Sequence, residues 1–203
     1  QVLDWSNPPF ATWFDDGALN VAFNCLDRHV AAGLGDRVAL HFEGEPGDSR
    51  DITYAELTSE VKKAANLLTS LGVGKGDRVI IYMPLIPEAV IAMLAVARLG
   101  AIHSVVFGGF SAHELAVRIE DAAPKAILAA SAGIEGKRTI AYKPLIDGAI
   151  ARAEHKPDFT MIFNFTMIFN FTIVFNFLET AQKAIPGTPR APIWPFHPSR
   201  TVL

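Results

Sequence analysis

The stretch Gly76–Ser111 constrains the fold of this chain more than any other segment. Arg78–Tyr82 is a short apolar run after a turn of Gly, Lys and Asp, which is typical of a buried parallel strand. Pro87 stands where the first residue of a helix would lie, and helix-forming apolar sequence then continues to Gly100. Ile102–Phe107 is a second apolar run, so the stretch predicts a strand, a helix and a strand.

A pair of glycines, Gly108-Gly109, follows the second of these strands at its carboxyl end. In open α/β sheets, ligands bind at that edge. Two residues without Cβ let the backbone approach a ligand closely, and a helix capped by Ser111 would aim free N–H groups nearby. A tight turn that needs a positive φ explains the two glycines equally well, so both interpretations stay open from the residues alone.

Further runs extend this pattern to an α/β fold. In Tyr54–Leu71 apolar residues recur at spacings of three and four, which predicts an amphipathic helix. Ser111 and Glu114 stand at the spacing of a capping box, at the start of a helix that reaches about Asp121. Ala126–Ala130 is a third apolar strand. The order of these elements predicts a partial, doubly wound parallel sheet.

The segments before this core suggest less regular structure. Gln1–Leu19 is rich in aromatic residues and Pro, and we expect an arm that lies across a larger body. Asn20–Ala32 predicts a helix, whereas Asp36–Phe42 and Ile52–Tyr54 flank a Gly/Pro/Asp turn and predict a hairpin. The first residue is not Met, which indicates a processed or partial chain.

A cationic run, Gly136–Arg138, follows the third predicted strand. It would place Lys137 and Arg138 at the same sheet edge as the two glycines, where cations beside exposed backbone donors suit a phosphate-bearing ligand. A solvated loop is the simpler alternative. The residues Lys137–Tyr142 and Pro144–Glu154 are expected to add a strand and a helix.

The sequence changes character at Thr160. A hexapeptide repeat, TMIFNF-TMIFNF-TIVFNF, fills Thr160–Phe177 without one charged residue. As a single strand it would be about three times the usual length, and as a membrane span it would bury three Asn side chains in lipid. It does match the profile of an aggregation-prone segment, so self-association through the repeat is one expectation.

Prolines then fall at every third position, from Pro186 to Pro198. That period places them on one face of a polyproline II helix, as in ligands of aromatic grooves, but a disordered tail is the simpler alternative. We therefore divide the chain into an arm with the first helix (1–35), a partial α/β domain (36–158), the Phe-rich repeat (159–178) and the Pro-rich tail (179–203).

Composition excludes several function classes. The formal net charge is −3 and the isoelectric point about 6.1, so the chain has no basic footprint for nucleic acid. The single cysteine, Cys25, excludes an internal disulfide framework. The six His are scattered without the spacing of zinc ligands, so no metal site is expected. No secretory signal and no membrane span are expected either.

Three stretches resemble short-chain acyl-CoA synthetases, the AMP-forming acetyl- and propionyl-CoA ligases of the adenylate-forming superfamily. They are LNVAFNCLDRHV (Leu19–Val30), ITYAEL (Ile52–Leu57) and the long segment Gly76–Leu115. The resemblance runs from about Trp5 to Asp158, which corresponds to the front part of the large domain of such enzymes. The repeat and the tail resemble no part of the family.

The resemblance implies a two-step reaction. ATP activates a small carboxylate to an acyl-adenylate with release of pyrophosphate, and coenzyme A then displaces AMP. It implies a pocket for the adenine end of coenzyme A at the Phe-Gly-Gly turn and a phosphate contact at the loop after the next strand. The residues at the matching positions are Phe107, Gly108, Gly109, Glu135, Gly136, Lys137 and Arg138. Glu135 departs from the family, because acetyl-type members carry a basic residue there.

Other family motifs do not occur in this sequence. The phosphate-binding loop that ends in Pro-Lys-Gly, the Tyr-Arg-Thr-Gly-Asp-type hinge region, the acyl pocket and the C-terminal domain with its adenylation lysine are all missing. We therefore expect no catalytic residue, and sites for ATP and Mg²⁺ only in full-length members. The stretches Ala132–Leu145 and His155–Asp158 look more like the propionyl-CoA branch than the acetyl-CoA branch.

These observations favour a fragment of an acetate or propionate–CoA ligase that is inactive on its own. The expected location is the cytoplasm, or the mitochondrial matrix if the source is eukaryotic. A non-catalytic fragment that binds coenzyme A is one alternative, and an interaction protein that acts through the repeat and the Pro-rich tail is another.

Overall fold

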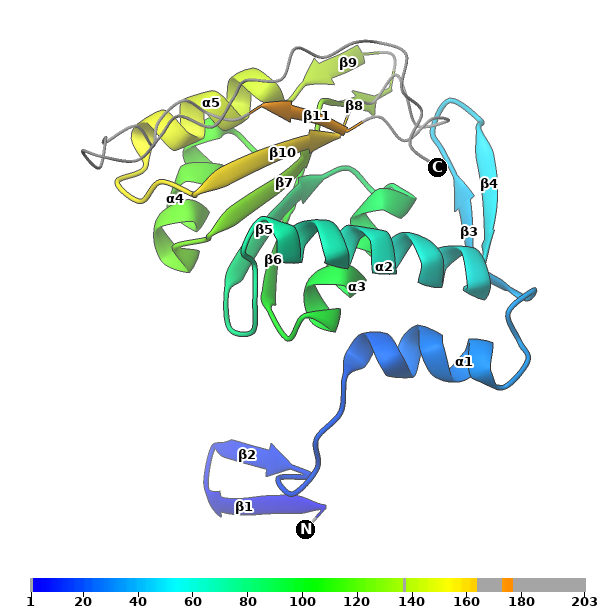
Figure 1. Cartoon of the computed structure of the whole chain (residues 1–203). Coiled ribbons are helices and arrows are strands. Elements are labelled where there is room, and N and C mark those ends of the chain that lie inside the picture. The colour runs from blue at the N-terminus through cyan, green and yellow to red at the C-terminus, as the bar shows by residue number, and fades with distance from the viewer. Residues whose placement is uncertain (1, 137, 164–172, 177–203) are drawn as a thin grey trace, which may run out of the picture.

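The computed structural model of the chain describes residues 2–136, 138–163 and 173–176 (Figure 1). Lys137, the second hexapeptide and the Pro-rich tail lie outside these residues.

The centre of the described part is a five-stranded sheet in the order β11-β10-β7-β5-β6. Strands β5, β6, β7 and β10 run parallel, whereas β11 runs antiparallel to β10. Their bounds are β5 Arg78–Met83, β6 Ile102–Phe107, β7 Ala126–Ala130, β10 Phe159–Phe163 and β11 Ile173–Asn176. Along the chain, β5 comes first, β6 then pairs with one edge of β5, and β7 pairs with its other edge. The strand order therefore reverses between β5 and β7, and a ligand of such a sheet binds beyond the carboxyl ends at that point.

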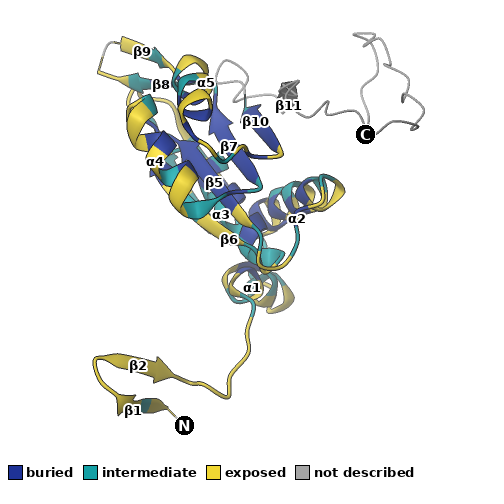
Figure 2. Cartoon of the chain, turned by 90° about the vertical axis from the view of Figure 1, so that its left-hand side faces the viewer, coloured by how far each residue is buried: buried dark blue, intermediate teal, exposed yellow. Residues whose placement is uncertain are grey.

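Helices cover both faces of this sheet (Figures 1 and 2). Their bounds are α2 Tyr54–Ser70, α3 Pro87–Arg98, α4 Ala112–Ala122 and α5 Lys143–Arg152. The β5–α3–β6 and β6–α4–β7 connections run in opposite directions across the sheet, so right-handed crossovers place α3 and α4 on opposite faces. Helix α2 packs beside α3, and α5 packs beside α4. The predicted doubly wound parallel sheet is confirmed.

The helix ends follow the predicted signals with one exception. Pro87 is the first residue of α3, and Gly100 takes a positive φ of 69° just beyond its end. Ser111 caps α4 by accepting a hydrogen bond from the Glu114 N–H at 3.3 Å. The predicted capping box is only half formed, however, because the Glu114 carboxylate accepts from Arg118 (3.1 Å).

The two central strands are buried on both faces, as the apolar runs predicted. Every residue of β7 is buried, and so is every residue of β5 except Arg78 (Figure 2). Strands covered by helices on both sides need continuous apolar sequence, whereas a one-sided sheet needs alternation. The run in β5 therefore indicated the parallel sheet correctly.

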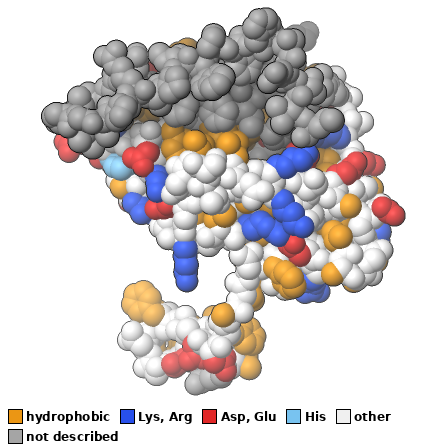
Figure 3. All heavy atoms as spheres, viewed as in Figure 1, with side chains coloured by type: hydrophobic (Ala, Val, Ile, Leu, Met, Phe, Trp, Pro, Cys, Tyr) orange, Lys and Arg blue, Asp and Glu red, His pale blue; other side chains and the backbone are white. Residues whose placement is uncertain are grey.

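The N-terminal arm differs from its prediction. Residues Leu3–Asn7 (β1) and Phe10–Trp13 (β2) form an antiparallel hairpin that stands away from the sheet instead of lying across it (Figures 1 and 3). Its side chains are largely exposed: Phe10 by 74% and Trp13 by 61%. The expectation failed because aromatic composition does not show which surface, if any, these rings contact.

The predicted first helix is confirmed and joins the arm to the core. It contains a π-helical stretch, Phe23–Asp27, that continues into α1 (Arg28–Ala31). The Asn20 side-chain amide donates to the carbonyls at the end of α3, and Asp27 accepts two hydrogen bonds of 2.7 Å from Arg98. These contacts fix the helix against the C-terminus of α3.

Two antiparallel hairpins lie outside the main sheet. The predicted hairpin is confirmed as β3 (Val38–Glu43) paired with β4 (Ser49–Thr53). The strand expected within Lys137–Tyr142 is β9 (Arg138–Ala141), but it pairs with β8 (Ala132–Glu135) and not with the parallel strands. The sequence analysis missed β8, because only Ser131 separates it from β7 and the composition of its four residues is not strongly apolar.

The first hexapeptide of the repeat belongs to the parallel sheet. β10 pairs in register with β7, from Phe159 opposite Ala126 to Phe163 opposite Ala130. Residues of the third hexapeptide form β11, which pairs with β10. The main sheet thus includes residues on both sides of position 159, where we predicted a boundary between domains. The division into domains stays a prediction. No helix of the described residues has the length and apolar character needed to span a membrane.

Candidate functional site

Three segments meet beyond the carboxyl ends of the parallel strands, near the point where the strand order reverses. They are the turn Phe107–Phe110 after β6, the part of the β8–β9 hairpin from Gly133 to Gly136, and Tyr142 at the start of α5. We call this group the diglycine corner. Its members come from separate parts of the chain, so the fold alone brings them together.

The two predicted glycines are needed here for space and not for backbone conformation. Neither Gly108 nor Gly109 has a positive φ, so the alternative of a tight left-handed turn is wrong. A Cβ on Gly108 would lie 2.5 Å from the Tyr142 hydroxyl oxygen. A Cβ on Gly109 would lie 2.8 Å from both Glu135 Oε1 and the Phe107 ring. Side chains of the β8–β9 region therefore press directly on the backbone of the turn.

A pair of tyrosines supports the turn from the sheet side. The Tyr82 hydroxyl, on β5, donates to the Phe110 carbonyl at 2.7 Å, and the rings of Tyr82 and Tyr142 are 5.1 Å apart. Burial raises the pKa of Tyr82 to about 12, with smaller contributions from Tyr142 and Glu135. Burial and then Glu135 also raise the pKa of Tyr142. Both hydroxyls thus stay protonated near neutral pH, and Tyr82 remains a donor.

The solvent side of the turn is aromatic. The Phe107 ring is 51% exposed and meets Phe110 edge to face, with 6.1 Å between the ring centroids. The Arg118 guanidinium of α4 lies 4.7 Å from the centre of the Phe110 ring. Exposed aromatic faces beside a cation offer a stacking surface to a planar ligand.

The turn of the β8–β9 hairpin contains a backbone N–H, that of Gly136, which donates a hydrogen bond within the chain. Gly136 takes a positive φ of 59°, and its N–H donates to Glu45 Oε1 at 2.7 Å. Glu45 lies in the turn between β3 and β4, so a carboxylate from a distant hairpin holds this donor. Across the β8–β9 hairpin, Glu135 is the register partner of Arg138.

The structure therefore brings most of the predicted site residues together. Gly109 lies close to both Glu135 and the Phe107 ring, and its neighbour Gly108 lies close to Tyr142. Gly136 and Arg138 lie on or at the turn of the same short hairpin as Glu135. Lys137 lies outside the described residues. The sequence analysis missed Tyr82, Tyr142 and Glu45. In the sequence, Tyr82 is part of an apolar run and shows no sign of a role at the site. No local pattern connects Tyr142 or Glu45 to the glycine pair.

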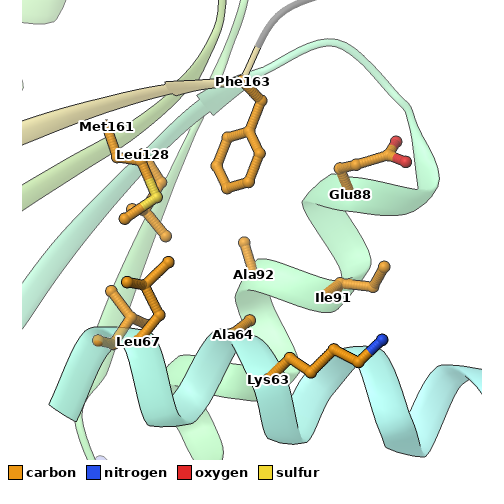
Figure 4. A pocket seen from close by; sticks show the side chains of 10 residues that line it. Lys63, Ala64, Leu67, Glu88, Ile91, Ala92, Leu128, Met161 and Phe163 are labelled. Atoms are coloured by element: carbon orange, nitrogen blue, oxygen red, sulfur yellow. The ribbon is translucent and has the colours of Figure 1, made fainter. Parts of the chain in front are cut away.

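A separate cavity of about 310 Å³ lies between α2, α3, β7 and β10 (Figure 4). Its wall is mostly apolar, with Lys63 and Glu88 among the lining residues. The Glu88 carboxylate accepts a 3.0 Å hydrogen bond from Arg50, while its second oxygen is buried without a partner. None of the predicted site residues lines this cavity. In the described part of the chain, no cluster of three or more His, Cys, Asp or Glu could hold a metal ion.

Comparisons with known proteins point to one family. A family described as "AMP-binding enzyme" matches residues 27–164, and one described as "Acetyl-coenzyme A synthetase N-terminus" matches residues 1–25. The chain is 66% identical to acetyl-coenzyme A synthetase of Streptomyces avermitilis over 76% of its own length and 24% of that relative. It is 60% identical to the Mycobacterium tuberculosis protein of the same name, over 74% and 23%.

A mitochondrial relative is more distant. The chain is 46% identical to acyl-CoA synthetase short-chain family member 3 of Rattus norvegicus, over 81% of this chain and 24% of the relative. The chain thus spans about a quarter of the length of these relatives. The names do not support the expected preference for the propionyl-CoA branch, because acetyl-coenzyme A synthetases dominate among them.

Proposed function

Since the chain belongs to the family of AMP-binding enzymes, we propose that it is the N-terminal portion of an AMP-forming short-chain acyl-CoA ligase and that its diglycine corner takes the nucleotide end of coenzyme A. Enzymes of this family use ATP, Mg²⁺ and coenzyme A. The observation that carries the proposal is the meeting of the Gly108-Gly109 backbone with the β8–β9 hairpin at the carboxyl edge of the sheet.

The chemistry of the corner supports a nucleotide ligand. Phe107 and Phe110 offer aromatic surface for an adenine ring, and Arg118 adds a cation beside it. Arg138 on the hairpin offers a cation to a phosphate, whereas Glu135 and Glu45 place negative charge beside it. The role of this chain in the reaction is then to hold and orient the thiol substrate, coenzyme A. Chemistry at the carboxylate falls to other residues of a full-length ligase.

We propose acetate as the carboxylate substrate of the corresponding full-length ligase, in line with the names of the relatives. Acetate and propionate differ by one methylene, which a tight acyl pocket distinguishes by roughly 1–3 kcal/mol. None of the described residues is assigned to that pocket. A ligase assembled from this chain and the missing segments should therefore show a higher kcat/KM for acetate than for propionate.

We also propose that the 203-residue chain does not catalyse the reaction alone. The sequence contains no loop of Ser, Thr and Gly that ends in Pro-Lys-Gly, and such donors supply most of the stabilisation of a transferring phosphate. A pyrophosphate-release assay with ATP, acetate or propionate, and coenzyme A checks this. Turnover above the background rate would contradict the proposal.

Calorimetry with coenzyme A tests the binding site itself. Gly109→Ala places a Cβ against Glu135 and Phe107 and should weaken binding about fivefold, because the Glu135 side chain, the Phe107 ring or the turn must shift. Gly74→Ala is the matched control, since a Cβ there meets no atom within 4 Å and lies at the opposite edge of the sheet. Dephospho-coenzyme A should bind more weakly than coenzyme A if the hairpin contacts the phosphate. Equal loss in both variants, or no binding by the unmodified chain, would overturn the proposed site.

A further inference from the structure

Tyr142 places a large side chain between the two backbones of the diglycine corner. It is only 3% exposed, and its N–H donates to the Ser131 carbonyl at 2.9 Å, just after β7. Its own carbonyl accepts from the Ile146 N–H at 2.9 Å, in the first turn of α5. The backbone of Tyr142 is therefore held on both sides, by β7 and by the first turn of α5.

The ring occupies the space that two glycines leave open. A Cβ on Gly108 would lie 2.5 to 2.7 Å from the hydroxyl oxygen and the adjoining ring carbons. A Cβ on Gly133, in β8, would overlap the same hydroxyl oxygen, and it would lie 2.7 Å from Cζ. Contacts below 3 Å essentially never occur for real Cβ atoms, so both positions must be Gly while Tyr142 keeps this place.

A second tyrosine fixes the other side of the ring. Tyr82 is fully buried in β5, its ring centroid lies 5.1 Å from that of Tyr142, and its hydroxyl holds the Phe110 carbonyl. The turn is thus attached to the sheet through Phe110 and to the hairpin through the ring of Tyr142. Tilted aromatic pairs of this kind contribute to stability beyond the area that they bury.

We propose that Tyr142 is the positioning residue of the diglycine corner: wedged between Gly108 and Gly133, it sets the distance between the ligand-binding turn and the β8–β9 hairpin. This role follows from packing, and its consequence for coenzyme A rests on the proposed function. Tyr142 touches no substrate in this account. It acts through the two glycine backbones, whose spacing separates the turn from the β8–β9 hairpin.

The test is a double-mutant cycle on thermal unfolding of the full chain. Gly108→Ala alone should lower Tm by roughly 5 °C, because overpacking against a fixed ring is destabilising. Tyr142→Leu removes the ring, so adding Gly108→Ala to it should lower Tm by less than about 1 °C more. Gly133→Ala should behave in the same way. The matched control pairs Tyr142→Leu with Gly74→Ala, and these two changes should add independently.

Additive losses for Gly108→Ala and Tyr142→Leu would overturn the proposal, because they would show that the ring does not restrict the turn. Tyr142→Phe serves where Tyr142→Leu fails to fold: it removes the hydroxyl oxygen nearest to the added Cβ but keeps the ring carbons at 2.6 and 2.7 Å, so it should relieve the damage of Gly108→Ala only in part. No relief at all would contradict the wedge.

A ligand readout separates positioning from mere stability. If coenzyme A binds, Tyr142→Leu should weaken it about tenfold at a temperature where the variant is folded, whereas Tyr142→Phe should stay within about threefold of the unmodified chain. Equal affinity in both variants would reject the positioning role. If the unmodified chain binds no coenzyme A, the proposed function fails, but the unfolding cycle still decides whether Tyr142 sets the spacing.

Discussion

The two edges of the parallel sheet are built on different principles. At the amino edge, Arg78 donates to the carbonyls of Ala122 and Ala123 at 3.0 and 2.8 Å and so satisfies the end of α4. Beside it, Asp77 accepts from the Gly74 N–H at 2.8 Å and pairs with Lys125 at 3.2 Å. At this edge, charged side chains therefore satisfy backbone groups and one another.

At the carboxyl edge the contacts are made by rings and by bare backbone. Tyr82 and Tyr142 fill the space beneath the turn, and Gly108 and Gly109 leave no side chain between the backbone and its neighbours. Phe107 is exposed. The comparison teaches that charged side chains satisfy the amino edge, whereas the carboxyl edge combines exposed aromatic surface with close backbone packing, the features on which the proposed binding site rests. Substitutions at the two edges should therefore separate stability from ligand binding.

The largest effect is expected from Tyr82→Ala. The ring is fully buried in β5, so its removal leaves a cavity and should lower the free energy of unfolding by about 3–5 kcal/mol. Tyr82→Phe keeps the ring and loses only the hydrogen bond to the Phe110 carbonyl, which should cost about 1 kcal/mol. Denaturant unfolding measures both changes. Equal losses in the two variants would mean that the hydroxyl, not the ring, supports the turn.

At the amino edge, Asp77→Ala should lower Tm and leave coenzyme A binding unchanged. The hydrogen bond from the Gly74 N–H, followed by Lys125, holds the pKa of Asp77 below its ordinary value of 3.8. A carboxylate with a lowered folded-state pKa stabilises the fold above its unfolded pKa and loses that contribution as the pH falls through the folded value.

The difference in Tm between Asp77→Ala and the unmodified chain should therefore be full at pH 7 and shrink below about pH 4. Thermal melts between pH 3 and pH 7 measure it. Asp77→Asn, which keeps an acceptor for Gly74 but no charge, separates the hydrogen bond from the ion pair. A difference that grows on acidification would contradict this account.

A smaller effect, of opposite sign, is expected from Glu45→Gln. The Glu45 carboxylate holds the Gly136 N–H, a donor that would otherwise be available to a phosphate oxygen. Removing the charge should strengthen binding of coenzyme A about threefold, and should change binding of dephospho-coenzyme A less. Calorimetry with both ligands measures the ratio, and Glu43→Gln on the same hairpin is the control. Weaker binding of coenzyme A in Glu45→Gln would show that the carboxylate supports the site.

The sheet was predictable because its signals are local. Pro87 and Gly100 bound a helix between two apolar runs, and the first run, β5, has the continuous apolar sequence of a strand buried on both faces. The second run, β6, is at the edge of the sheet and is mostly exposed. The hairpin β8–β9 was harder, since short strands outside the main sheet carry neither a long apolar run nor a clear alternation. The position of the N-terminal hairpin could not be predicted, because composition does not say which surface an aromatic residue meets.

The candidate site was predictable only in part, for a similar reason. The glycine pair and the hairpin turn could be placed at one sheet edge from topology. Their close packing depends on Tyr142, which lies 34 positions after Gly108 and 9 after Gly133. Glu45 is 91 positions from its partner Gly136. Contacts over such separations leave no pattern in one sequence, so the physical reason for the glycines became clear only in three dimensions.

The most direct measurement is an amide-resolved NMR titration of the full chain with coenzyme A. The account predicts that the amides of Gly108, Gly109 and Gly136 at the carboxyl edge shift with ligand concentration, while those of Gly74 and Gly76 at the amino edge stay in place. Shifts confined to the amino edge, or no shifts at millimolar ligand, would contradict the assignment of the diglycine corner as the nucleotide site.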